Sequence, residues 1–327
     1  MIPPKCNFIY YSTAFENCNC KGKDFVVNCC AVMKMKKQLR GSAYLLLATF
    51  IWGTTFIAQS VGMDHIGPFT FQAIRCALAV IGMIAVIFLF DKKEGRSFRA
   101  GWTDKQLWKA GLSCGIPLFM ACNLQQVGIV YTTAGKAAFL TAMYIVLVPV
   151  LGLFLKRKIT FMVPISVAIA VLGLYFLSFA GVTEVNIGDL LALSSALMFA
   201  IQIQSVDRFA SQVDPLRLNC IQAGVVAIGS AVIALFTEDN TATAILSCWF
   251  PLCYAGFLSM GAAYSLQILG QKHVEPTAAS LIMSLESVFA VLAGWLLLNE
   301  IMTSAEASGC VLMFIAVILS QIPIKKK

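Results

Sequence analysis

Long apolar segments separated by short polar segments recur along the chain after residue 40. A helix needs about 20 largely apolar residues to cross about 30 Å of hydrocarbon. Ten segments reach that length: Gly41–Ser60, Pro68–Phe90, Leu107–Val130, Thr133–Leu155, Phe161–Phe179, Ile187–Ser205, Pro215–Phe236, Ala244–Leu269, Thr277–Leu298 and Ser304–Ile322. They lack the alternation typical of lipid-facing strands, so the pattern predicts ten transmembrane helices. The third and eighth are long enough to tilt, or to break near Pro117 and Pro251.

The composition supports this interpretation. Of 327 residues, 59% are hydrophobic and 12% are charged, and the mean hydropathy is +0.82. Soluble domains are about half apolar and about a quarter charged. The composition excludes a disordered chain, and it argues against a soluble enzyme, which would expose large apolar patches. We therefore expect an all-α integral membrane protein whose surroundings are a lipid bilayer.

The basic residues lie on one side of the predicted helices. With the N-terminus inside, the even-numbered loops and both ends hold Lys34, Lys36, Lys37, Arg40, Lys92, Lys93, Arg96, Arg99, Lys105, Lys109, Lys156, Arg157, Lys158, Arg208, Arg217, Lys272, Lys325, Lys326 and Lys327. The odd-numbered loops contain no lysine or arginine. This positive-inside pattern predicts a multi-pass protein of the cell (inner) membrane with both termini in the cytoplasm. It also explains the net charge of +8 without a nucleic-acid partner.

Residues 1–36 fall outside the pattern of helices. They contain Cys6, Cys18, Cys20, Cys29 and Cys30, but the spacing matches no standard zinc motif, so we expect no metal. Met35 opens the run MKKQLRG, which resembles a natural start. We expect 1–36 to be a disordered or mis-started cytosolic extension, and 323–327 to be a basic cytosolic tail.

The second half of the chain repeats features of the first. Gly41 and Gly188 each open a predicted helix 147 positions apart, and the same spacing relates Pro68 to Pro215. The runs FLKRKIT and LLNEIMT follow at a spacing of 143. Because five helices are an odd number, a second set must be inverted in the membrane. We predict two inverted five-helix repeats, 37–180 and 187–322, an architecture typical of secondary transporters; chance matches between apolar helices are the alternative.

Three stretches resemble a known family. They are YLLLATFIWGTTFIAQS (Tyr44–Ser60), GIVYTTAGKAAFLTAMYIVLVPVLGLFLKRKIT (Gly128–Thr160) and PTAASLIMSLESVFAVLAGWLLLNEIMT (Pro276–Thr303). They resemble the EamA-like branch of the drug/metabolite transporter superfamily. The resemblance implies two EamA-like repeats that form a ten-helix carrier, often an exporter of amino acids or related compounds. The chain departs from the family pattern at Lys156–Lys158, where the family often has a glutamate.

Few full charges lie inside the predicted helices. Lys109, Arg217 and Glu306 lie at the edges, within reach of water, and Asp189 suits a helix cap. Three charges are then left inside the segments: Arg75, Lys136 and Glu286. Such charges face a cavity or a partner, because they are costly in hydrocarbon.

Each of these three charges has two interpretations. Glu286 lies near the middle of its helix, where desolvation favours the protonated form and suits a proton-coupled carrier; the alternative is a permanently neutral residue in a structural hydrogen bond. Arg75 and Lys136 both lie toward the outer side, where they would attract a carboxylate or phosphate. The alternatives are an ion-pairing role for Arg75 and snorkelling to headgroups for Lys136.

Uncharged polar residues at depth complete the set of substrate-binding candidates. They are Trp52, Asn123, Gln202 and Tyr264. Such residues are also common as interhelical hydrogen bonds and as packing aromatics.

We therefore predict a secondary active transporter that exports a small metabolite by alternating access. The chain has no P-loop, HExxH motif or nucleophile elbow, so we expect no enzyme and no cofactor. The alternatives are an intramembrane lipid-modifying enzyme, a non-transporting scaffold or receptor, and a channel. The sequence is compatible with a homodimer.

Overall fold

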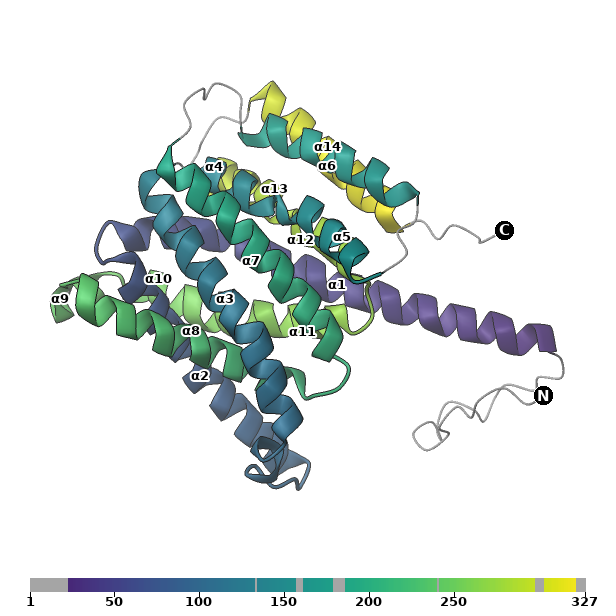
Figure 1. The fold of residues 1–327 in the computed structure, drawn as a ribbon, viewed down its shortest axis with the longest axis horizontal. Coiled ribbons are helices and arrows are strands. Elements are labelled where there is room, and N and C mark those ends of the chain that lie inside the picture. The colour runs from purple at the N-terminus through teal and green to yellow at the C-terminus, as the bar shows by residue number, and fades with distance from the viewer. Residues whose placement is uncertain are drawn as a thin grey trace. The chain divides into compact units, whose positions relative to one another are not determined.

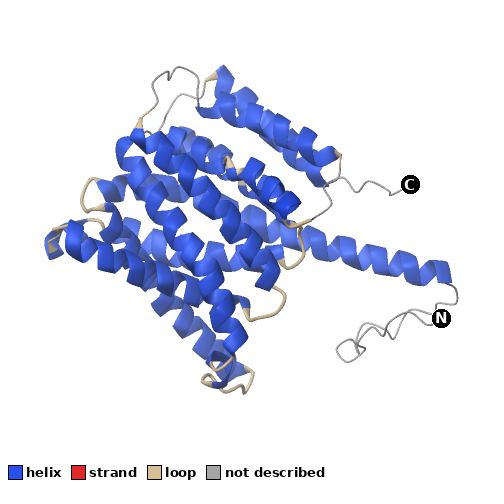
Figure 2. Ribbon diagram, viewed as in Figure 1, coloured by secondary structure: helices blue, strands red, loops and turns tan. Residues whose placement is uncertain are grey.

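The computed structural model describes residues 23–132, 134–156, 161–178, 186–239, 241–297 and 303–321. These residues form helices and loops, with no strand among them (Figure 2). The chain divides into a first unit, Met1–Leu39, and a second unit, Arg40–Lys327. Residues 23–36, which belong to the predicted extension, are helical, whereas residues 1–22 and 322–327 lie outside the described residues.

Helices follow one another along the chain (Figure 1). Those of the first half are α1 (Lys23–Met63), α2 (Pro68–Lys93), η1 (Ala100–Trp102), α3 (Lys105–Tyr131), α4 (Ala134–Ala142), α5 (Tyr144–Phe154) and α6 (Met162–Ser178). Those of the second half are α7 (Ile187–Phe209), α8 (Pro215–Thr237), α9 (Ala242–Ser247), α10 (Trp249–Cys253), the π-helix η2 (Tyr254–Ala263), α11 (Tyr264–Gln271), α12 (Pro276–Met283), α13 (Glu286–Leu297) and α14 (Ser304–Gln321).

Within the described residues, eight helical spans are long and apolar enough to cross a membrane. They coincide with the first four and the sixth to ninth predicted segments. Two shorter apolar helices, Met162–Leu177 and Ser304–Ser320, coincide with the fifth and tenth. These two helices, α6 and α14, pack side by side (Figure 1). The described residues are thus all-helical, with several spans that suit a membrane by length and composition.

Two spans are interrupted where the sequence predicted continuous helices. The first interruption is at Met143, between α4 and α5, and the second is at Ser284–Leu285, between α12 and α13. Conversely, α3 continues through Pro117, so of the two alternatives given for this segment, tilt or break, the break does not occur. The eighth segment does break, at Cys248, and Pro251 lies in the first turn of α10, where a proline costs no hydrogen bond.

Glycines allow two pairs of helices to approach closely. A Cβ atom on Gly41 would lie 2.9 Å from the carbonyl oxygen of Gly270, so α1 and α11 touch through their backbones. In the same way, a Cβ atom on Gly188 would lie 2.7 Å from the carbonyl oxygen of Gly128, between α7 and α3. Small residues at such crossings permit the van der Waals packing that holds membrane helices together.

We expect Gly188→Val to lower the free energy of unfolding by about 1–3 kcal/mol, because added methyl groups would force α7 away from α3. Thermal or denaturant unfolding of the detergent-solubilised protein measures this effect. Gly224→Val is the control, since a Cβ atom at Gly224 in α8 would meet nothing within 4 Å. Equal losses of stability in the two variants would contradict the expectation.

Acidic residues link the two ends of the packed pair α2 and α8. At one end, Asp91 of α2 forms an ion pair with Arg217 of α8, and both side chains are buried. At the other end, the Glu238 carboxylate accepts hydrogen bonds from the backbone N–H groups of Phe69 (2.9 Å) and Thr70 (2.8 Å). The prediction that Arg217 lies within reach of water is therefore wrong.

The capping role predicted for Asp189 is confirmed, since Asp189 forms a capping box with Asn186 at the start of α7.

Candidate functional site

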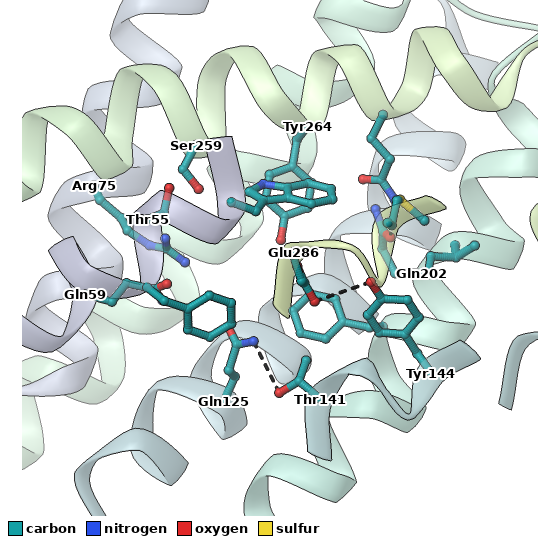
Figure 3. A pocket seen from close by; sticks show the side chains of 16 residues that line it. Thr55, Gln59, Arg75, Gln125, Thr141, Tyr144, Gln202, Ser259, Tyr264 and Glu286 are labelled. Carbon is teal, nitrogen blue, oxygen red and sulfur yellow. Dashed lines mark hydrogen bonds between the residues drawn. The ribbon is translucent and has the colours of Figure 1, made fainter. Parts of the chain in front are cut away.

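A cavity lies within the second unit (Figure 3). Helices from both halves of the chain contribute its wall: α1, α2, α3, α4, α5, α7, η2, α11, α12 and α13. Sixteen side chains line it: Trp52, Thr55, Phe56, Gln59, Arg75, Gln125, Thr141, Tyr144, Phe199, Gln202, Ile203, Ser259, Tyr264, Gln267, Met283 and Glu286. The wall is therefore a mixture of aromatic, amide, hydroxyl and charged groups.

Five of the seven predicted site residues meet in this cavity: Trp52, Arg75, Gln202, Tyr264 and Glu286. Asn123 does not line it. Its side chain donates to Ser230 Oγ at 2.9 Å and to the Phe119 carbonyl oxygen at 2.8 Å, so it links α3 to α8. The backbone of Lys136 lies in α4, but its side chain lies outside the part of the chain that the structure describes.

Glu286 occupies the first position of α13, directly after the interruption of its span. Its side chain is 7% exposed and accepts a hydrogen bond from the Tyr144 hydroxyl at 3.3 Å (Figure 3). Tyr144 is in turn the first residue of α5, directly after the other interruption. The cavity therefore lies where two discontinuous spans meet, an arrangement that transporters use for binding.

Arg75 supplies the positive charge of the wall. Its side chain is 3% exposed, and its Nε donates to Gln72 Oε1 at 2.6 Å. Gln72 is itself held, because its Nε2 donates to the Cys122 carbonyl oxygen at 2.9 Å. No carboxylate among the described residues forms an ion pair with Arg75. A buried charge without such a partner is suited to bind an anionic group.

Two other polar atoms of the wall are buried without a hydrogen-bond partner in the described structure. They are the indole Nε1 of Trp52 and the amide oxygen Oε1 of Gln267. The Trp52 ring packs against Tyr264, with ring centroids 4.9 Å apart. Most buried polar groups in proteins are hydrogen-bonded, and an unpaired one costs free energy. One donor and one acceptor are thus available to a bound molecule.

Sequence reasoning missed several lining residues, of which Tyr144 and Gln267 are the most informative. Tyr144 is 142 positions before Glu286, and Gln267 is 142 positions after Gln125, and both of these partners also line the cavity. The spacings of 147 and 143 seen in the sequence lead from Glu286 to Phe139 and Met143, so the nearer of them misses Tyr144 by one position. For Gln267 the only signal was an amide deep in an apolar segment.

These observations define a polytopic membrane protein with a polar internal cavity, the class to which small-molecule transporters belong. The model of the EamA-like transporter family matches two stretches of the chain, 39–179 and 186–321. The chain belongs to this family of membrane proteins, and the resemblance noted in its sequence is confirmed.

Relatives support the same assignment. An uncharacterized transporter of Archaeoglobus fulgidus is 33% identical over 291 residues, 86% of this chain and 86% of the relative. The uncharacterized transporter YoaV of Bacillus subtilis is 23% identical and matches 82% of this chain and 92% of its own. A crystal structure at 16% identity superposes with a TM-score of 0.73 over 86% of this chain and 96% of its own, a likeness of fold alone. The chain is therefore a member of a family of membrane transporters.

Proposed function

We propose that this protein is a secondary active transporter that exports a small metabolite, such as an amino acid or a related compound, by proton-coupled alternating access. The observation that carries the proposal is the cavity itself. It buries a glutamate and, among the described residues, an arginine without a carboxylate partner and two polar atoms without a hydrogen-bond partner. Such groups are costly unless a ligand or a proton uses them, which favours transport over an intramembrane enzyme or a scaffold.

The architecture that we propose has ten transmembrane helices in two inverted repeats, 37–180 and 187–322, in the cell membrane with both termini cytoplasmic. The cavity wall supports it. Twelve of the sixteen lining residues form six pairs at two constant spacings. The pairs at 147 positions are Trp52/Phe199, Thr55/Gln202 and Phe56/Ile203, and those at 142 are Gln125/Gln267, Thr141/Met283 and Tyr144/Glu286. Paired lining is expected when a site lies on a two-fold axis between repeats.

Contacts at the two ends of α2 and α8 are also related to each other by the spacing of 147 positions. Asp91 is 147 positions before Glu238, and Thr70 is 147 positions before Arg217. Asp91 contacts Arg217, and Glu238 contacts Thr70. Reciprocal contacts of this kind are typical of an interface between two-fold-related elements. They support a mechanism in which the repeats move against each other around the cavity.

The charges of the wall favour a dipolar substrate. The repeat partner of Arg75 is Gln222, and the partner of Glu286 is Tyr144, so each charge is present in only one repeat. Figure 3 shows Arg75 on one side of the cavity and Glu286 nearer its centre. We assign Arg75 to an anionic group of the substrate, and Glu286 to the coupling proton or to a cationic group. Lys136 is assigned to attracting anions toward the cavity.

Transport into proteoliposomes tests the proposal. Vesicles with the purified protein receive labelled amino acids and small metabolites, with and without a pH gradient, and empty vesicles serve as controls. We expect at least one compound to move faster than in empty vesicles, and an imposed gradient to increase its accumulation. If no compound of a broad panel moves through verified, folded protein, the proposal fails.

A further inference from the structure

A chain of side-chain amides leads from the protein interior to the cavity. Gln267 Nε2 donates to Gln202 Oε1 at 3.2 Å, Gln202 Nε2 to Gln222 Oε1 at 3.4 Å, and Gln222 Nε2 to Asn219 Oδ1 at 2.8 Å. All four side chains are buried, and the first two line the cavity. Every donor in the chain points in the same direction, away from Gln267.

The far end of the chain fixes this direction. The Nδ2 group of Asn219 lies 2.9 Å from the carbonyl oxygens of Met260 and Gly261. Carbonyl oxygens only accept hydrogen bonds, so Asn219 must present its NH₂ group to them and its oxygen to Gln222. Each amide in turn must then donate to the next, and the orientation of every group follows from the network. Gln267 is left with a buried oxygen that has no partner among the described residues.

The opposite side of the cavity has the opposite polarity. Gln72 donates to the Cys122 carbonyl oxygen, so its own oxygen must accept from Arg75. The pair Gln72 and Arg75 lies 147 positions before the pair Asn219 and Gln222, and the two pairs make corresponding hydrogen bonds. Arg75 and Gln202 lie on opposite sides of the cavity in Figure 3. One side thus presents a cation and the other presents a hydrogen-bond acceptor.

From this geometry we propose that Gln267 determines specificity by accepting a hydrogen bond from an N–H or O–H donor of the ligand, whose anionic group faces Arg75. This inference rests on the proposed function, since it assigns the ligand of the same cavity. The ligand class is a small carboxylate that carries a polarised donor. A ligand without the donor leaves the Gln267 oxygen unpaired, and sites built for hydrogen bonding discriminate strongly against such analogues.

Binding of matched acids to the full-length protein in nanodiscs tests this assignment. Each set shares one side chain and one carboxylate and differs only at the α-carbon, which carries an amine, a hydroxyl or a hydrogen: alanine, lactate and propanoate, and the corresponding leucine and phenylalanine sets. Ligand-induced thermal shifts at several concentrations give the affinities. For at least one set, we expect the wild type to prefer a donor-bearing acid over the donor-less acid by about tenfold or more.

Gln267→Met removes the amide while keeping the length of the side chain. We expect the preference to fall to within about threefold, with the affinity for the donor-less acid unchanged or higher. Gln271→Met is the matched control. Gln271 lies one turn further along α11 and also has a buried amide oxygen without a partner in the described part of the chain, but it does not line the cavity. It should keep the wild-type preference.

Gln267→Glu provides a second test should the methionine variant fail to fold. In its protonated form the introduced carboxyl group can still donate to Gln202 Oε1 and keep its other oxygen as an acceptor, so we expect the donor-bearing acids to be preferred still, with the amine favoured over the hydroxyl. The assignment is overturned if Gln267→Met weakens all three acids equally, if Gln271→Met matches it, or if no set binds to the wild type. Transport of some other compound class would leave the proposed function standing in that last case. If binding depends on Gln267 but no compound is transported, the role of Gln267 in ligand specificity is supported and the proposed transport function is refuted.

Discussion

Glu286→Gln is expected to abolish the response of transport to a pH gradient and to slow transport about ten- to a hundredfold. Glutamine has nearly the same shape but carries no exchangeable acid, so a proton can no longer bind and leave at this position. A hydrogen bond to a charged group contributes about 1.5–3 kcal/mol, which corresponds to the expected loss of rate. The measurement is uptake into proteoliposomes with the gradient imposed and then collapsed.

Two further variants separate coupling from packing. Glu94→Gln changes an exposed carboxylate outside the cavity and should transport like the wild type. Tyr144→Phe removes the hydroxyl that donates to Glu286, and we expect it to change the pH dependence while retaining transport. If Glu286→Gln transports with an unchanged gradient response, Glu286 is a packing residue and the coupling group must be sought elsewhere.

The sequence predicted the helical spans well because lipid imposes a length and an apolar composition on each of them. It also predicted Arg75 and Glu286, since a charge inside an apolar segment requires a cavity or a partner. The interruptions at Met143 and Ser284–Leu285 could not be predicted in this way. Neither contains proline or glycine, the residues that mark a helix break in a sequence.

The side of a helix on which a residue lies explains the other differences between prediction and structure. Asn123 and Gln125 are two positions apart on α3, yet only Gln125 lines the cavity, whereas Asn123 contacts α8. Hydropathy gives the depth of a residue but not the direction of its side chain. Arg217 was misplaced for a related reason, because the segment edge at Pro215 does not reveal that Asp91 lies against it.

Asp91→Asn is expected to destabilise the fold by up to about 3–5 kcal/mol, because it leaves the buried Arg217 guanidinium with only the longer ion pair to Asp214, at 3.9 Å. Asp91 is 2% exposed and Arg217 is 6% exposed, so both charges are largely shielded from water. The guanidinium also lies over the ring of Trp102, 5.7 Å from its centroid, and its Nε has no partner in the described structure. Unfolding of the solubilised protein, followed by intrinsic fluorescence, gives the change.

A double-mutant cycle shows whether the loss belongs to the pair. Asp91→Asn combined with Arg217→Gln removes both charges, and we expect it to recover part of the stability lost in either single variant. The control is the surface pair of Arg96 and Glu94, whose side chains are 55% and 53% exposed, and for which Glu94→Gln should cost less than about 1 kcal/mol. A cost for Asp91→Asn no larger than that of the control would contradict a buried ion pair.

The repeat-related counterpart of the Asp91–Arg217 pair is the contact of Glu238 with the start of α2. This contact involves no buried arginine, so Glu238→Gln should cost less than Asp91→Asn. The Asp91–Arg217 contact and the Glu238 contact, which the proposed repeats relate, would then stabilise the two ends of the α2–α8 pair unequally. The helices would separate more readily at the Glu238 end.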